Sequence, residues 1–173
     1  MKPTLPVYLN FVQKANIGTE LQGNWPISRL KRLSEALLSN EGDVKVELVF
    51  DRAGRIPFIE GHLRAELKLK CQRCMQEMAF VVDNRFKLGL VLNEKQMTEL
   101  PDEYEPYLVK EDNNFLPDIL EDELLLSLPL VAMHDFDCSE HLVSNTSDQD
   151  NEVGIIEPEE GKKNPFAVLK DLL

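Results

Sequence analysis

The chain has 173 residues, 43% hydrophobic and 29% charged, a composition that excludes a fibrous or wholly disordered protein and fits one domain. No apolar run approaches the roughly 18 residues that a membrane span needs, and the N-terminus lacks the apolar stretch of a secretory signal, so we expect a cytoplasmic protein. The net charge of −12 is uneven: residues 1–93 carry 14 Lys and Arg against 10 Asp and Glu, which gives +4, whereas residues 94–173 carry 5 against 21, which gives −16. This asymmetry fits a nucleic-acid-binding face beside an acidic region, although +4 is also ordinary surface charge.

The first elements are short and separated by turn residues. A proline within residues 5–9 predicts an edge strand there. A helix is expected over 26–39, because Leu30 and Leu33 recur at helical spacing and Pro26 suits a first turn. Apolar residues alternate with polar ones over 44–50, which predicts a strand that ends in a turn at 51–55.

The clearest pattern is a long β-hairpin. Apolar residues occupy odd positions from 63 to 71 and even positions over most of 80–92, with charged or polar residues between them. A period of two predicts strands that bury one face and leave the other in water. Cys71 and Cys74 lie at the reversal between the two strands, so the hairpin is tipped by a Cys-x-x-Cys motif.

The second half of the chain begins with an edge strand at 104–109, followed by an amphipathic helix at 117–128. Residues 144–163 are polar and acidic and are expected to form a flexible linker. Residues 164–173 are predicted to form a short amphipathic helix in which Phe166 and Leu169 share one face. Such a short helix is marginal alone, so we expect it to dock through these two residues, either on its own domain or on a partner. The fold class is thus α+β: an antiparallel sheet with a long Cys-tipped hairpin and two or three helices, with one domain over 1–143.

The cysteines suggest a metal site. Cys71 and Cys74 at a tight turn supply two ligands, and a structural zinc needs four. Cys138 is the natural third ligand, and His134 or His141 the fourth; we assign His134. Three cysteines are too few for a disulfide framework, and reduced structural thiols remain the simpler alternative, so zinc is a possible cofactor rather than a required one.

Catalysis has weaker support. A redox Cys-x-x-Cys usually begins a helix, whereas strands flank this one. Asp118, Asp122 and Glu123 form the only dense carboxylate cluster, and the charge preference of a helix start explains most of it. Glycine-rich phosphate loops and the hydrolase motifs are missing from the sequence. We therefore expect a protein that binds rather than an enzyme, without a small-molecule substrate or a membrane partner.

Basic residues cluster near the predicted helix start and along the hairpin. They could contact the phosphates of RNA, or they could simply form the solvated faces of these elements. The candidate RNA-binding residues are Arg29, Lys31, Arg32, Arg64, Lys68, Lys70, Arg73 and Arg85.

Four segments, taken together, resemble the bacterial YceD family over the whole length of the chain. They are residues 69–74 (LKCQRC), 100–106 (LPDEYEP), 121–129 (EDELLLSLP) followed by His134-Asp135, and 164–169 (NPFAVL). The resemblance implies a role in the synthesis, processing or stability of large-subunit (23S) rRNA. It brings no established catalytic residues.

The resemblance and the residues together predict a ribosome-biogenesis factor that binds large-subunit rRNA or its precursor. The alternative is an adaptor that binds a large-subunit ribosomal protein or another biogenesis factor without touching RNA.

Overall fold

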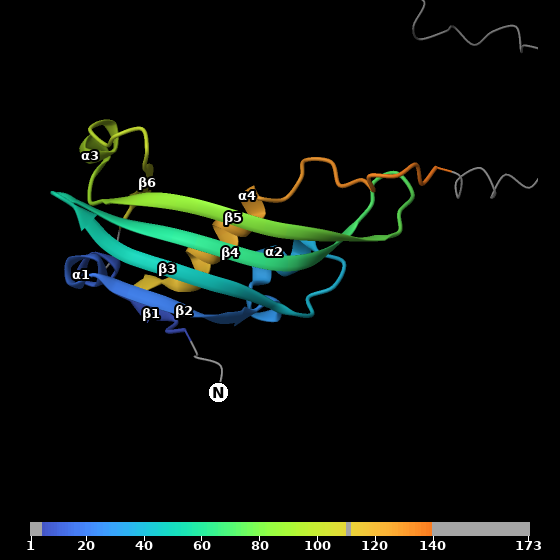
Figure 1. The fold of residues 1–173 in the computed structure, drawn as a ribbon, viewed down its shortest axis with the longest axis horizontal. Coiled ribbons are helices and arrows are strands. Elements are labelled where there is room, and N and C mark those ends of the chain that lie inside the picture. The colour runs from blue at the N-terminus through green and yellow to red at the C-terminus, as the bar shows by residue number, and fades with distance from the viewer. Residues whose placement is uncertain (1–4, 110–111, 140–173) are drawn as a thin grey trace, which may run out of the picture. The chain divides into compact units, whose positions relative to one another are not determined.

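The centre of the fold is a five-stranded sheet built around one long hairpin (Figure 1). The computed structural model describes residues 5–109 and 112–139. In this sheet the first four strands are antiparallel neighbours, and the last runs parallel to the one before it. In sheet order the strands are β2 (Thr19–Pro26), β3 (Asp43–Ala53), β4 (Ile56–Lys70), β5 (Glu77–Val91) and β6 (Glu105–Leu108).

The sheet has one covered face and one open face. On β4, Leu63, Ala65 and Leu67 are buried, whereas the residues between them are exposed. The register continues this alternation across the hairpin, since Leu67 pairs with Phe80 and Lys70 with Glu77. The predicted α+β fold, its antiparallel hairpin and its period of two are confirmed.

Short helices cover one face of the sheet (Figure 1). In α4 (Leu116–Leu126) the apolar stripe Leu116, Ile119, Leu120 and Leu124 is buried in the core, which confirms the helix expected at 117–128. The remaining elements include a separate two-stranded sheet made by the first and last strands of the chain's described part. They are β1 (Tyr8–Leu9), α1 (Phe11–Ile17), the 3₁₀ turn η1 (Ile27–Arg29), α2 (Lys31–Ala36), α3 (Glu94–Thr98), β7 (Asn114–Phe115) and α4 (Leu116–Leu126).

The helix expected over 26–39 is much shorter in the structure. Pro26 is the last residue of β2 and has an extended backbone, so the helix cannot begin there. The chain makes the 3₁₀ turn η1 first, and α2 then ends before Leu37, whose backbone is again extended. Leu30 and Leu33 are fully buried as expected. The spacing of Leu30 and Leu33 therefore predicts their burial correctly, but it does not predict the length of the helix.

The sequence prediction also missed α1 and β2. Asn10 caps α1 by accepting a hydrogen bond from the backbone of Gln13, and Gly18 ends it with a left-handed backbone (φ 74°). Both residues are ordinary helix signals. The strand predicted at 104–109 exists as β6 at the sheet edge, but it is parallel to β5. The strand predicted at 5–9 is reduced to the two residues of β1.

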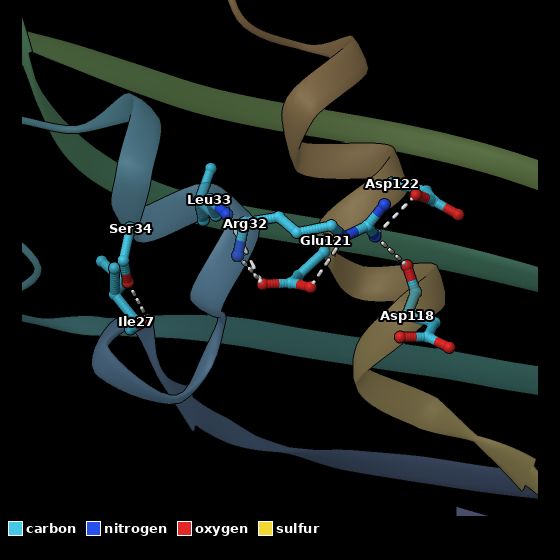
Figure 2. A network of polar contacts seen from close by, with 7 residues as sticks. All are labelled: Ile27, Arg32, Leu33, Ser34, Asp118, Glu121 and Asp122. Atoms are coloured by element: carbon cyan, nitrogen blue, oxygen red, sulfur yellow. Dashed lines mark hydrogen bonds and ion pairs between the residues drawn. The ribbon is translucent and has the colours of Figure 1, made fainter.

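Glu121 of α4 joins two helices that are far apart in the sequence (Figure 2). Its buried carboxylate accepts hydrogen bonds from the backbone N–H groups of Arg32, at 2.8 Å, and Leu33, at 3.4 Å. These are the second and third residues of α2, whose N-cap residue Leu30 offers no side-chain cap. Glu121 therefore caps α2 from another element and supplies the negative charge that a helix N-terminus favours.

The Arg32 guanidinium completes this contact. Its Nε donates to Glu121 at 3.1 Å, and its terminal nitrogen lies 2.7 Å from the Asp122 carboxylate and 3.4 Å from the Asp118 carbonyl (Figure 2). The carboxylates of Asp122 and Glu121 raise the pKa of Arg32. A cation near a helix start is unfavourable by itself, and here the compensating anions come from α4 rather than from an outside partner.

The predictions for residues 144–163 and for the helix at 164–173, with Phe166 and Leu169, lie outside the described residues. Among the helices that the structure describes, none has the length and apolarity to cross a membrane.

We predict that Glu121→Ala lowers the free energy of unfolding by about 2 kcal/mol, because it leaves the backbone N–H groups of Arg32 and Leu33 and the Nε of Arg32 without their acceptor. Urea unfolding followed by circular dichroism measures this change. Glu35→Ala, on the exposed side of α2, is the matched control and should change stability by less than about 0.5 kcal/mol. Equal losses in the two variants would contradict the capping role.

Candidate metal centre

Cys71 and Cys74 lie in the turn that closes the β4–β5 hairpin. The backbone N–H of Cys71 donates to the carbonyl of Gln76 at 2.9 Å, and that of Met75 donates to the carbonyl of Cys71 at 2.9 Å. Met75 has a positive φ of 63°, which is uncommon outside glycine. The turn is thus tightly folded, and both cysteine side chains are buried.

A second segment runs to this turn from the end of α4 (Figure 1). The N–H of Gln72 donates to the carbonyl of Ala132 at 2.7 Å, and the Arg73 guanidinium donates to the carbonyl of Phe136 at 3.1 Å. Arg73 also lies 3.6 Å from the carboxylate of Asp137. These contacts hold residues 132–138 against the hairpin end.

The two segments together form a cluster of four possible metal ligands. The ligand atoms of Cys71, Cys74, His134 and Cys138 all lie within 4.8 Å of one another. The Sγ atoms of Cys71 and Cys138 are 3.7 Å apart, and Cys74 Sγ is 3.5 Å from His134 Nδ1. All three cysteines are free thiols.

These separations fit tetrahedral coordination. With Zn–S and Zn–N bonds of about 2.3 and 2.0 Å, a tetrahedron places two sulfurs about 3.8 Å apart and a sulfur and a nitrogen about 3.5 Å apart. The Cys71–Cys138 and Cys74–His134 distances match these values. The remaining distances between ligand atoms, which all lie within 4.8 Å, would need to shorten by no more than about 1 Å for tetrahedral coordination. Three cysteines and one histidine are also a common donor set for structural zinc.

The orientation of His134 supports a ligand role. Its Nε2 lies 3.2 Å from the backbone carbonyl of Glu77. Because a carbonyl can only accept, the proton of the neutral imidazole is assigned to Nε2, and the lone pair of Nδ1 then faces the thiols. Fixing the second ring nitrogen in this way is typical of metal-binding histidines.

The thiols differ in their readiness to ionise. Burial by itself raises the pKa of Cys71, but backbone hydrogen bonds from Cys74, His134 and Arg73 outweigh it and lower that pKa to about 5. Burial, followed by the neighbouring sulfurs of Cys74 and Cys71, raises the pKa of Cys138 to about 11. At neutral pH Cys71 would therefore bind a metal ion as a thiolate, whereas binding by Cys138 would require the loss of its proton.

The structure thus brings together the four ligands predicted from the sequence. His141, the other candidate for the fourth ligand, lies outside the described residues. The role of the Glu77 carbonyl was not predicted, because nothing in the sequence pairs a backbone group on β5 with His134. The redox alternative lacks its usual context here too, since Cys71 directly follows β4 rather than beginning a helix.

The eight candidate RNA-binding residues do not form one surface. Those on the hairpin strands project from the open face of the sheet, and Arg73 lies at its end. Those in the early helical segment belong to η1 and α2, which pack on the covered face (Figure 1). The open-face group is Arg64, Lys68, Lys70 and Arg85, and the other group is Arg29, Lys31 and Arg32.

Carboxylates on the open face neutralise part of its positive charge. Arg64 lies 2.6 Å from Glu47, and Lys68 lies 3.3 Å from Glu77. Neither Lys70 nor Arg85 forms an ion pair with any residue in the described ranges, although Asp83 neighbours Arg85 in sequence and helps to balance its charge. Lys70 and Arg85 are therefore the most available cations of the open-face group.

Two of the three carboxylates considered as a catalytic cluster have structural partners. Asp122 pairs with Arg32, and Glu123 accepts a hydrogen bond from Asn84 at 3.2 Å. His62, on the open face, lies 2.6 Å from Asp83, and this hydrogen bond lowers the pKa of Asp83. These contacts agree with structural roles for Asp122, Glu123 and His62.

The fold and the site define an α+β protein whose hairpin end carries a Cys₃His cluster. The family model described as "Large ribosomal RNA subunit accumulation protein YceD" matches residues 59–173. A Haemophilus influenzae protein named "Large ribosomal RNA subunit accumulation protein YceD" is 33% identical over 174 residues, which cover 99% of this chain and 97% of that protein. No solved structure matches. The chain belongs to the YceD family.

Proposed function

We propose that this protein promotes the accumulation of large-subunit rRNA by binding, without catalysing a reaction. The observation that carries the proposal is the similarity, over nearly the whole chain, to a relative named for large ribosomal RNA subunit accumulation. The geometry is consistent with binding, because Asp122 and Glu123, two carboxylates of the candidate catalytic cluster, are engaged in structural contacts.

The RNA contact that we propose lies on the open face and leads to the hairpin end. Arg64, Lys68, Lys70 and Arg85 project from β4 and β5 toward solvent, and Arg73 follows at the turn. The intervening carboxylates keep this surface from being strongly basic, so we expect modest affinity and a small number of phosphate contacts.

We also propose that Cys71, Cys74, Cys138 and His134 hold a structural zinc ion. All four ligands come from the protein, which leaves no open position for a substrate. A zinc ion there would tie residues 134–138 to the hairpin end and fix the turn that presents Arg73. A bound zinc ion would thus cross-link these two segments and would not take part in a reaction.

Zinc analysis of the purified full-length protein tests this site. We expect about one zinc per chain and loss of most of it in Cys138→Ser and His134→Asn. His62→Asn and His141→Asn are the controls and should retain the metal. Because a bound zinc ion would displace the proton of Cys138, the apparent affinity of the protein for zinc should also fall as the pH is lowered. Zinc retained in Cys138→Ser, or absent from the wild type even after zinc is added, would contradict the proposal.

The RNA contact is tested by mobility shift with precursor fragments of large-subunit rRNA at several salt concentrations. We expect binding that weakens steeply with salt. The double variant Lys70→Gln/Arg85→Gln should reduce the slope of log affinity against log salt by about two. Lys14→Gln/Lys95→Gln makes the same change in net charge on α1 and α3 and should leave the slope nearly unchanged.

Two results would oppose direct RNA contact. Absence of binding at low salt would rule out the contact itself. Equal weakening in the two double variants would show that net charge, rather than the open face, governs binding.

A further inference from the structure

An apolar groove lies beside α4, away from the hairpin end. It has a volume of about 340 Å³ and lies where α4 meets β5 and β6. Its apolar lining comes from Leu88, Tyr107, Ile119, Leu125 and Leu126. Leu126, the last residue of α4, is 77% exposed, so an apolar side chain at the groove is left in water.

Two carboxylates complete the lining of this groove. They belong to Asp122 and Glu123. Glu123 is only 7% exposed, and Asn84 is the sole described residue that gives its carboxylate a hydrogen bond. No Lys or Arg of residues 5–109 and 112–139 forms an ion pair with Glu123, and Arg32 reaches Asp122 from the α2 side.

The charged side chains that line the groove are both carboxylates. Burial is the main cause that raises the pKa of Glu123; the hydrogen bond from Asn84 opposes it, and Glu105 and Asp122 raise it further. The pKa of Tyr107 is raised by burial and then by Asp118 and Asp122. A buried carboxylate without a cation is costly, and a positive group placed beside it would remove part of that cost.

We propose that this groove is the docking site for a short segment of a basic protein. One or two aliphatic side chains would fill the space between Tyr107 and Leu126, and a Lys or Arg beside them would pair with Glu123 and Asp122. RNA is a poor occupant, because its phosphates would face these carboxylates. The inference goes beyond the proposed rRNA role and does not depend on RNA contact by the open face.

The test uses the ¹⁵N-labelled full-length chain and a synthetic amphipathic peptide of leucine and lysine. A peptide of the same pattern with glutamate in place of lysine is the matched probe. We expect the lysine peptide to shift the amide signals of Tyr107 and Leu126 and the glutamate peptide to leave them in place. Glu123→Gln, which keeps an oxygen for Asn84, should weaken binding of the lysine peptide about tenfold.

A second variant keeps the test independent of any effect on folding at Glu123. Leu126→Ser changes an exposed residue and should weaken binding about fivefold, as expected for the loss of one partly buried aliphatic contact. Leu130→Ser removes a leucine that is 99% exposed outside the groove lining and should have no effect.

Four results would overturn the proposal: no binding of the lysine peptide, equal binding of the glutamate peptide, the same signal shifts with an rRNA fragment, or the same shifts on raising the protein concentration alone. The last two would assign the groove to RNA or to a second copy of the chain. Failure here leaves the salt dependence of rRNA binding unaffected, so the two proposals fail separately.

Discussion

The end of the hairpin is held against residues 132–138 by hydrogen bonds and by a cluster of three cysteines and one histidine. The strands β4 and β5 have 15 residues each and span about 50 Å. The helices do not cover the end of these strands next to the turn (Figure 1). The main core includes β4 as far as Leu67 and β5 from Phe80 onward. Beyond that point Leu69 is still buried, and the three buried cysteines form a separate cluster with Met78 packed against them. This end of the hairpin therefore depends on a small cluster whose chemistry is that of a metal site rather than of an apolar core.

The acidic second half of the chain has a structural role close to the sheet. Glu121 caps α2, and Asp122 neutralises Arg32. Glu123 instead lies beside an apolar groove with an amide as its only described donor. Three consecutive carboxylates of α4 thus do three different things, because helical geometry points each of them toward different neighbours. Contacts within the fold thus account for Glu121 and Asp122 among the acidic residues of this half.

Much of the fold could be predicted because the hairpin obeys a strict period of two. The four candidate metal ligands could be predicted as well, since Cys71 and Cys74 share a turn and the other candidates were few. The length of α2 could not, because burial of Leu30 and Leu33 is compatible with a 3₁₀ turn followed by a short helix. The capping of α2 by Glu121 depends on packing between residues about 90 positions apart, and no local pattern records it. In contrast, Asn10 and Gly18 did mark α1, and that helix could have been found.

A zinc ion in tetrahedral coordination would join the hairpin to the segment after α4. X-ray absorption at the zinc edge of the purified full-length protein tests this coordination. We expect three sulfur atoms at about 2.3 Å and one nitrogen at about 2.0 Å from the metal. A shell of oxygen and nitrogen without sulfur, or one with fewer than three sulfurs, would contradict it.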